Sequence, residues 1–486
     1  MNFAANKGKR RELPRFRRET KICPSRKPAY AVFLTPIAVM AKRQEGRVHM
    51  NLILLSGGSG KRLWPLSNDI RSKQFIEIFK NEDGEYESMV QRMYRSIKKI
   101  DKDAKVTIAT SKAQVSELIH QLGEDINISV EPSRRDTFPA IALAASYLHD
   151  VMGVPEDEAV IICPVDPYVE DDYFEALKKL DELAQNGKSN LTLMGMEPTY
   201  PSEKYGYILP KTSDKVSEVS EFKEKPSEEK AKEYIEEGAL WNAGIFACKV
   251  GYILKRAHEL IPFKDYDDLF KKYDKVTKIS FDYAVVEHES SIQVMRFSGM
   301  WKDLGTWNTL TEAMEENTIG NVTLSDTCEN TKVINALDIP VLCMGTKNLI
   351  VASSPEGILV SDPGESSYMK PLVEKFDPTV RYAEKSWGKY EVIDVGNDSL
   401  TIKVTMNAGH QMSYHSHKRR SEVWTVVSGE GEAIIDGSSH PVHAGDVITI
   451  HPGSKHSILA ESDMKLIEVQ IGKDIDAKDK KKFEIK

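Results

Sequence analysis

The sequence predicts three structural units in succession: an α/β domain with a mainly parallel, doubly wound sheet, a short β module, and a C-terminal β-barrel. Three observations lead to this prediction. Apolar runs alternate with amphipathic stretches up to about residue 195, closely spaced β-prone runs occupy 327–362, and an all-β segment with glycine-rich turns extends from about 383 to 472. A chain of 486 residues is long enough for several hydrophobic cores.

In the first unit, expected strands and helices alternate. Buried strands are predicted at 51–56, 105–110, 127–130, 159–166 and 191–196. Helical spacing of apolar residues is found at 86–100, 111–123, 139–153 and 172–187. This alternation favours a parallel sheet, and such sheets bind ligands at the carboxyl ends of their strands. The glycine-rich stretch after the first strand and Asp166 both occupy such ends.

Shifts in composition place the boundaries of the units. We expect a basic extension outside the fold at 1–49, the α/β domain at 50–317, the β module with a linker at 318–375, the barrel at 376–474 and a charged, solvated tail at 475–486. The short, closely spaced strands of the β module are typical of a left-handed β-helix-like arrangement of rungs. Regular strands and glycine-rich turns in the last unit favour a small barrel or jelly roll.

Charge is distributed unevenly along the chain. Residues 1–49 contain 13 Lys or Arg and 3 Asp or Glu, whereas the whole chain has a formal net charge of −8. A basic, arginine-rich leader is typical of a transit peptide or a nucleic-acid-binding arm. Because Met50 directly precedes the first predicted strand, we favour a start at Met50, with the leader as an over-extended reading frame. The acidic body gives no support to nucleic-acid binding.

Cysteine usage and hydropathy indicate the compartment. The five cysteines are scattered and form no CxxC pair, which argues against a disulfide framework and favours a reducing compartment. No apolar run approaches the ~20 residues needed to span a bilayer. We therefore expect a cytoplasmic protein without a membrane partner. The sequence leaves the oligomeric state open, including a homo-oligomer.

A glycine-rich stretch, LLSGGSGKRLWPLS (54–67), follows the first predicted strand. Its glycines allow backbone N–H groups to approach phosphate oxygens, and basic side chains follow them. The residues suited to phosphate are Gly57, Gly58, Gly60, Lys61, Arg62 and, a little further on, Lys73. The spacing is neither that of a Walker P-loop nor that of a dinucleotide fingerprint. Taken alone, such a turn could also serve only to reverse the chain.

The stretch resembles the signature of the nucleotide-sugar pyrophosphorylases, and most closely that of the mannose-1-phosphate guanylyltransferases. Seven further segments resemble this family's motifs in the same order: EPSRRDTFPAIALAA (131–145), CPVDPYVEDDYF (163–174), YGYI (205–208), FKEKP (222–226), WNAGIF (241–246), FDYAVVEH (281–288) and WKDLGTW (301–307). The resemblance covers roughly residues 50–320 and implies a Rossmann-like nucleotidyltransferase domain.

The resemblance implies that GMP is transferred from GTP to mannose 1-phosphate, giving GDP-mannose and pyrophosphate, by Mg²⁺-assisted direct in-line displacement. It implies catalytic roles for Arg62, Lys73 and Lys225, and a Mg²⁺ site at Asp166 and Asp303. The implied nucleotide-binding residues are Gly57, Gly58, Gly60, Lys61, Glu131, Arg135 and Thr137. The implied sugar-phosphate-binding residues are Gly206, Glu224, Lys225 and Asn242.

The chemistry of the reaction agrees with these residue types. One anion must attack the α-phosphorus of another, so the site has to offset their repulsion, hold them collinear and neutralise the pyrophosphate that leaves. Basic side chains suit the triphosphate, and Mg²⁺ prefers carboxylate and phosphate oxygens together. No side-chain nucleophile is needed.

The chain departs from the family pattern near the expected base and metal sites. Ser72 stands where the family usually has Pro, Asp136 and Phe138 where it has Asn and Ala, and Pro167 where it has His. A pyrophosphorylase for a different nucleotide or sugar 1-phosphate therefore stays open. A second alternative is a non-catalytic sugar-phosphate sensor, against which the retained basic and acidic residues argue.

A second constellation lies in the predicted barrel, in GHQMSYHSHKRRSEVWTVVSG (409–429). Alternation along a strand places His415 and His417 on one face, Glu422 can join from the next strand, and HPGSKH supplies His456. Imidazoles with a carboxylate suit Zn²⁺, Fe²⁺ or Mn²⁺. The spacing resembles the metal motif of the cupins, which implies that these four residues hold such a metal.

Two segments, SWGKYEVID (386–394) and RSEVWTVVSGEG (420–431), resemble the type II mannose-6-phosphate isomerase domain of the cupins. This implies interconversion of mannose 6-phosphate and fructose 6-phosphate. The chain departs from that domain at His415, where Gln is frequent, and in the tail, where KDIDAKDKKKFEIK replaces an acidic, arginine-bearing motif. Isomerase activity and a cupin that binds metal or sugar without turnover both stay open.

Overall fold

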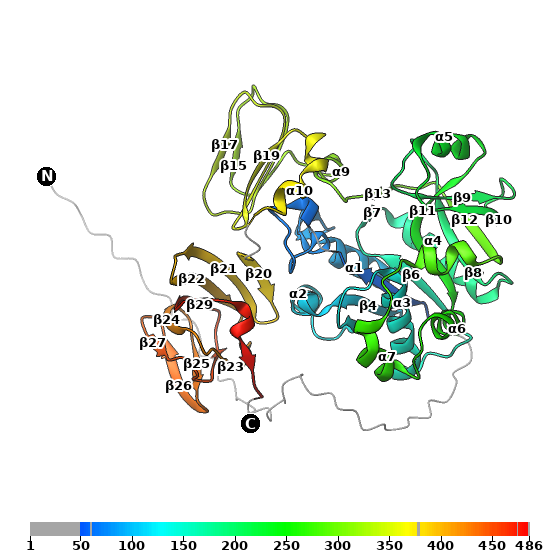
Figure 1. Ribbon diagram of the computed structural model, residues 1–486. Helices are drawn as coiled ribbons and strands as arrows, with labels where there is room; N and C mark the ends of the chain where they lie inside the picture. The colour runs from blue at the N-terminus through cyan, green and yellow to red at the C-terminus, as the bar shows by residue number, and fades with distance from the viewer. Residues whose placement is uncertain (1–48, 59–60, 377–379, 474, 485–486) are drawn as a thin grey trace, which may run out of the picture. The chain divides into compact units, whose positions relative to one another are not determined.

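The computed structural model describes residues 49–58, 61–376, 380–473 and 475–484 (Figure 1). Apart from His49, the predicted basic extension lies outside the described residues, as does Gly60 of the glycine-rich stretch. The predicted fold class is confirmed, since an α/β domain, a β module and a two-sheet barrel follow one another along the chain. No helix in these ranges is long and apolar enough to cross a membrane.

Nine strands form the sheet of the α/β domain, in the order β5-β4-β1-β6-β11-β8-β12-β10-β9. They are β1 (Asn51–Ser56), β4 (Lys105–Ser111), β5 (Asn127–Glu131), β6 (Ala159–Pro164), β8 (Leu191–Met196), β9 (Gly206–Pro210), β10 (Val216–Lys223), β11 (Leu240–Lys249) and β12 (Ile292–Phe297). The first four strands in this order are parallel, as predicted. β11 runs antiparallel to β6 and β8, so the sheet as a whole is mixed.

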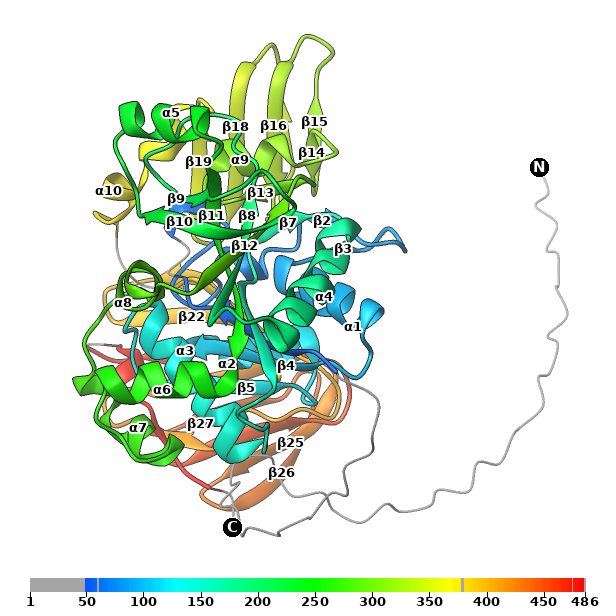
Figure 2. The same ribbon diagram turned by 90° about the vertical axis from the view of Figure 1, so that its right-hand side faces the viewer.

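Helices cover both faces of this sheet. Those of the first domain are α1 (Met89–Ile100), α2 (Val115–Leu122), α3 (Thr137–Ser146), α4 (Asp171–Asn186), α5 (Glu228–Glu236), α6 (Val250–Leu260), α7 (Tyr266–Lys272) and α8 (Phe281–Ala284). Residues of β1 alternate between two hydrophobic cores, with Leu52 and Leu54 in one and Ile53 in the other. Figure 2 shows α1 and α4 on one side of the sheet and α3 and α6 on the other.

Capping explains where two predicted helices begin. The helix expected at 86–100 begins at Met89, because Ser88 forms a capping box with Gln91. The helix expected at 139–153 begins earlier, at Thr137, because Asp136 caps it and adopts a φ of 72°. Two short strands, β7 (Pro167–Val169) and β13 (Trp301–Asp303), pair in antiparallel fashion beside the end of β6.

The β module consists of short stacked strands followed by α10 (Lys370–Val373). Its strands are β14 (Thr318–Ile319), β15 (Val322–Leu324), β16 (Glu329–Asn335), β17 (Val341–Cys343), β18 (Lys347–Ser354) and β19 (Gly357–Ser361). β14, β16 and β18 pair in parallel, as do β15 and β17, which forms the rungs that the spacing predicts. The module contacts the end of the glycine-rich stretch, where the Ser354 hydroxyl donates to the Pro65 carbonyl at 2.6 Å.

The C-terminal barrel is built from two antiparallel sheets. The six-stranded sheet contains β20 (Tyr382–Lys385), β21 (Gly388–Val395), β22 (Ser399–Met406), β29 (Met464–Ile471), β24 (Ser421–Ser428) and β27 (Val447–Ile450). The other contains β26 (Ser438–His443), β25 (Glu430–Ile435), β28 (His456–Ala460), β23 (His415–Ser416) and β30 (Lys481–Lys482). Fully buried Trp424 lies in the core between them.

The tail has a feature that the prediction did not include. A charged, solvated segment was expected at 475–486, and within it β30 pairs with β23, with Ser416 opposite Lys481. The Phe483 amide donates to the Tyr414 carbonyl at 2.8 Å, which continues the pairing. The lysine side chains remain exposed, so the charged sequence gives no sign that the backbone of this segment pairs at the edge of a sheet.

Candidate active site and metal centre

The carboxyl end of the parallel strands brings together three charged residues that are distant in the sequence. Asp166 follows β6, and Asp303 ends β13, where it lies opposite Pro167 of β7. The Nζ atom of Lys73 lies 2.6 Å from Asp166 Oδ2 and 3.2 Å from Asp303 Oδ1. The lysine therefore bridges the two carboxylates for which a metal-binding role was predicted.

The electrostatics of this triad indicate a site for cations. Burial alone would lower the pKa of Lys73, but the charges of Asp166 and Asp303 outweigh it and raise that pKa above its usual value. The two aspartate side chains are 30% and 40% exposed, so a solvated ion can reach them. Two open carboxylates are the donor set that fits Mg²⁺, which retains several of its waters.

Side chains from two later segments hold the glycine-rich stretch in place. The Gly58 carbonyl accepts hydrogen bonds from the Ser72 hydroxyl at 2.7 Å and from the Gln114 amide at 3.2 Å. Ser72, where the family usually has proline, thus supplies a contact that proline could not make. Arg62 is exposed beyond this loop.

Residues predicted to bind the nucleotide lie beside the loop and contact a later segment. Buried Glu131 ends β5 next to Gly57 and accepts a hydrogen bond from the Tyr273 hydroxyl at 2.8 Å. The Arg135 guanidinium donates to the Asp274 carbonyl, and the Thr137 hydroxyl accepts from the backbone amide of Phe281 at 2.8 Å. These contacts attach the base-binding candidates to 273–281.

The predicted sugar-phosphate residues also converge. β9 pairs with β11 so that Gly206 lies opposite Asn242, and a side chain at Gly206 would collide with Glu224 and Asn242. Glu224 is buried, and its Oε2 has no hydrogen-bond partner among the described residues. Lys225 pairs with the other oxygen of Glu224 and has a positive φ of 47°. A buried acceptor beside a cation suits a ligand that has hydroxyls and a phosphate.

Asp282 completes this cluster and was not predicted. Its Oδ1 accepts a hydrogen bond from Asn242 Nδ2 at 2.7 Å. Burial, followed by the charge of Glu224, raises the pKa of Asp282 to about 6. Its motif, FDYAVVEH, was recognised without a role for this residue.

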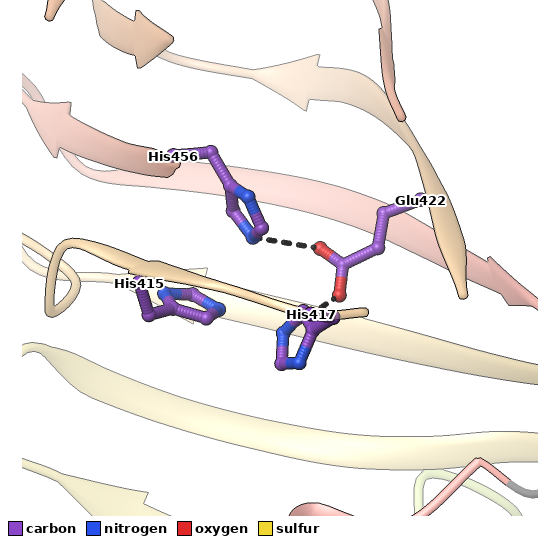
Figure 3. Close-up of side chains that lie close together, drawn as sticks. All are labelled: His415, His417, Glu422 and His456. Atoms are coloured by element: carbon purple, nitrogen blue, oxygen red, sulfur yellow. Dashed lines mark ion pairs between the residues drawn. The ribbon is translucent and has the colours of Figure 1, made fainter. Parts of the chain in front are cut away.

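The barrel gathers the four predicted metal ligands. His415, His417, Glu422 and His456 are all buried, and one ligand atom from each lies within 4.8 Å of the others. Figure 3 shows the three rings and the carboxylate directed toward one another. His415 comes from β23, Glu422 from β24 and His456 from β28, so the cluster depends on both sheets of the barrel.

Backbone carbonyls orient two of the rings. His415 Nδ1 lies 2.6 Å from the Ser413 carbonyl, and His456 Nδ1 lies 3.0 Å from the Ser454 carbonyl. Each Nδ1 therefore carries the proton and leaves Nε2 as the ligand atom. His417 Nδ1 is buried and has no hydrogen-bond partner in the described part of the chain. Orphaned ring nitrogens and a carboxylate fit a divalent transition metal.

The protonation states also suit a metal. Burial lowers the pKa of His415 to about 2 and that of His417 to about 4. Burial would raise the pKa of Glu422, but its neighbours His456, His417 and Arg420 hold it at about 2. Near neutral pH the two histidines are uncharged and the carboxylate is ionised, which is the state that metal ligands require.

Comparisons with known proteins identify the chain. The family model described as "Nucleotidyl transferase" matches residues 51–319, which is more than half of the sequence. The chain belongs to the nucleotidyl transferase family. A second model, "Mannose-6-phosphate isomerase C-terminal", matches residues 377–485 of this nucleotidyltransferase.

Relatives resemble the nucleotidyltransferase over most of its length. The mannose-1-phosphate guanylyltransferase of Escherichia coli K12 is 29% identical over 473 residues, which cover 89% of this chain and 97% of the relative. The alginate biosynthesis protein AlgA of Pseudomonas putida is 28% identical over 469 residues, covering 89% and 95%. A crystal structure from Thermus thermophilus, described as a mannose-1-phosphate geranyltransferase, is 25% identical, covers 67% of this chain and 98% of its own, and has a TM-score of 0.57.

Arg420 is the second residue of the nucleotidyltransferase that sequence reasoning missed. Its buried guanidinium lies 3.2 Å from Glu422 Oε1 and 2.9 Å from His417 Nε2, and it donates to the Asp476 carbonyl. The signal was present in the sequence, because Arg420 stands two residues before Glu422 and therefore on the same face of the strand.

Proposed function

We propose that the protein transfers GMP from GTP to mannose 1-phosphate, giving GDP-mannose and pyrophosphate. The observation that carries this proposal is the cation site of Lys73, Asp166 and Asp303 at the carboxyl end of the sheet of a nucleotidyltransferase. The name of the Escherichia coli relative supports the choice of guanine and mannose.

Each part of the site has a role in direct displacement. Asp166 and Asp303 would hold Mg²⁺, which supplies charge neutralisation for the phosphates when bound. Lys73 has a flexible four-carbon stem and can exchange a carboxylate for a phosphate oxygen of the triphosphate. The backbone amides of Gly57 and Gly58 and exposed Arg62 would position the same group. The reacting oxygen comes from the sugar phosphate itself.

The second cluster would hold that sugar phosphate. Glu224 Oε2, buried without a partner among the described residues, would accept a hydrogen bond from a sugar hydroxyl. Asp282 fixes the amide of Asn242, so that Asn242 presents a defined orientation to the sugar. Lys225, more than half exposed, would bind the phosphate and hold its oxygen in line with the α-phosphorus.

Pyrophosphate release tests the proposal. The full chain is incubated with Mg²⁺ and mannose 1-phosphate, together with GTP, ATP, CTP, UTP or dTTP in separate reactions. Release that depends on GTP supports the proposal, whereas release with another nucleotide keeps the mechanism and changes the substrate. Absence of release with every nucleotide and several sugar 1-phosphates would favour the sensor.

A second activity is supported by the barrel. We propose that the metal cluster serves the interconversion of mannose 6-phosphate and fructose 6-phosphate. A metal on His415, His417, Glu422 and His456 would polarise the carbonyl of the open-chain sugar. Buried Glu468 lies on β29, which pairs with β24 beside Glu422. Burial and the charge of Glu422 raise its pKa to about 7, so it can take up and release a proton near neutral pH.

Isotope exchange tests the isomerase. Mannose 6-phosphate is incubated in D₂O with protein loaded with Mn²⁺, Zn²⁺ or Fe²⁺, and NMR follows both fructose 6-phosphate and deuterium at C2. Both should appear, and both should be lost in His456→Ala. If the protein retains metal but neither fructose 6-phosphate nor deuterium at C2 appears, the barrel is a cupin that binds metal or sugar without turnover.

A further inference from the structure

The C-terminal segment 476–483 is attached to residues 414–420, which include the ligands His415 and His417. The Asp479 carboxylate accepts hydrogen bonds from the backbone amides of Lys418 and Arg419, at 3.1 and 2.9 Å. Beyond it, Lys481 pairs with Ser416 of β23. Both neighbours of Lys480 are therefore fixed to the segment between His415 and Arg420.

Lys480 itself is placed at the edge of the cluster. The pairing of β30 with β23 sets Lys482 opposite His415 and Lys481 opposite Ser416, so Lys480 continues the strand toward His417. The charges of Glu468 and Glu422 act on its ammonium. The residue is exposed, and no hydrogen bond or ion pair joins it to another residue in the described part of the chain. It is thus a cation that reaches both the cluster and the solvent.

Two other nearby cations are already occupied. The Arg420 guanidinium contacts Glu422, His417 and the Asp476 carbonyl. Lys481 is directed elsewhere, with its Nζ atom 5.2 Å from the centroid of the Phe483 ring. Lys482 lies opposite His415, and Lys480 is the cation of this segment whose charge interacts with both Glu468 and Glu422.

Charge indicates what this ammonium would bind. Glu422 is ionised and Glu468 titrates near neutral pH, so a divalent ion together with Arg420 and Lys480 would leave the loaded site with a net positive charge. A phosphate monoester carries about −1.5 to −2 at pH 7 and has three acceptor oxygens. A neutral sugar would leave the charge of Lys480 without a partner.

We propose that Lys480 binds the phosphate group of a sugar phosphate at the mouth of the histidine cluster. The assignment rests on the proposed sugar-phosphate chemistry of the barrel, but it concerns binding and does not require turnover. It also gives a function to a tail that lacks the arginine-bearing motif of similar domains. The alternative is structural, with Lys480 serving only to balance the charge of Glu468 and Glu422.

Binding is measured by ³¹P NMR on the full chain loaded with Mn²⁺, because the paramagnetic ion broadens the signal of a phosphate held near it. The probes are mannose 6-phosphate and inorganic phosphate, with neutral mannose as a competitor. His456→Ala lacks a cluster ligand, so broadening that persists in this variant belongs to another Mn²⁺ site and is subtracted. Elemental analysis gives the metal content of each variant.

We expect Lys480→Gln to weaken mannose 6-phosphate binding by about tenfold to a hundredfold, the usual range for a charged hydrogen bond. Lys480→Arg should retain binding within about threefold, because the charge is kept. Lys481→Gln is the matched control and should bind as the wild type does. Metal content should be equal in all three variants.

Several outcomes would overturn the assignment. These are wild-type affinity in Lys480→Gln, loss of metal in Lys480→Gln, absence of cluster-dependent binding in the wild type, and equal affinity for inorganic phosphate and the sugar phosphate. If binding depends on Lys480 while the wild type catalyses no exchange, the proposed isomerase fails and the role of Lys480 stands.

Discussion

The two candidate metal sites hold their carboxylates in opposite ways. In the α/β domain, Asp166 and Asp303 are partly exposed and share the ammonium of Lys73. In the barrel, Glu422 is buried among three imidazoles and a guanidinium. A partly exposed site suits an ion that arrives with its substrate, whereas a closed site with neutral nitrogens suits a resident ion. If both candidate sites bind metal, we expect exchange of the ion at the first and retention at the second.

Asp303→Ala should produce the largest difference between the activities of the two sites. We expect pyrophosphate release to fall by about a thousandfold or more, because one of two oxygen donors is lost while Lys73 keeps a single partner. Sugar-phosphate exchange at the barrel should be unchanged in the same preparation. Full pyrophosphate release in this variant would remove Asp303 from the proposed metal site.

His456→Ala is the reciprocal change. Metal retained after gel filtration should fall to background, and exchange at C2 should fall by at least about a hundredfold. Initial rates of pyrophosphate release should remain within about twofold of the wild type. Equal loss of both activities would show that the two sites depend on each other.

Lys225→Ala addresses the sugar-phosphate side of the open site. Loss of one charged hydrogen bond should raise KM for mannose 1-phosphate by about tenfold to a hundredfold. KM for GTP should change little, and Lys225→Arg should recover part of the effect. If KM for GTP rises instead, Lys225 binds the triphosphate and not the sugar phosphate.

The smallest expected effect is a pH dependence of the closed site. His415 and His417 have folded-state pKa values of about 2 and about 4, below the ordinary 6.5. Between these values and 6.5 the unfolded chain binds more protons at these two positions, so their contribution to the stability of the metal-free protein falls as the pH falls from 7 to 5. The loss is about 2 kcal/mol for each histidine, as urea unfolding of the wild type beside a histidine variant would measure.

His415→Gln removes one of these titrating groups and provides the control. Between pH 7 and 5 the free energy of unfolding should change less unfavourably in the variant than in the wild type, by roughly the contribution of one histidine. An undiminished slope would assign the effect to other groups.

The sequence predicted those parts of each site that lie on regular elements. Asp166 follows β6 at the carboxyl end of the main sheet, as expected for such strands. Asp303 ends β13, which pairs with β7 outside that sheet, and its assignment to the same site came from the family resemblance. Alternation along a strand likewise placed His415 beside His417. Local capping moved helix boundaries by two or three residues, as at Ser88 and Asp136.

Residues that act through distant contacts were not predictable in this way. Asp282 gains its role from Asn242, 40 positions away, and no local pattern encodes that hydrogen bond. Lys480 lies in a run of lysines and acidic residues that is typical of a solvated tail. Backbone pairing with β23 decides its position, and edge pairing depends little on side-chain pattern.

The contacts between the β module and the glycine-rich stretch affect the order of events during synthesis. The Pro65 carbonyl is bound by Ser354, 289 positions later, and the Trp64 carbonyl by the indole of Trp307, 243 positions later. A nascent chain that has emerged only as far as the α/β domain lacks the first of these contacts. The glycine-rich stretch can reach its final anchoring only after the ribosome has synthesised the module. A chain truncated before residue 354 would therefore contain the sheet but lack the contact of this stretch with β18.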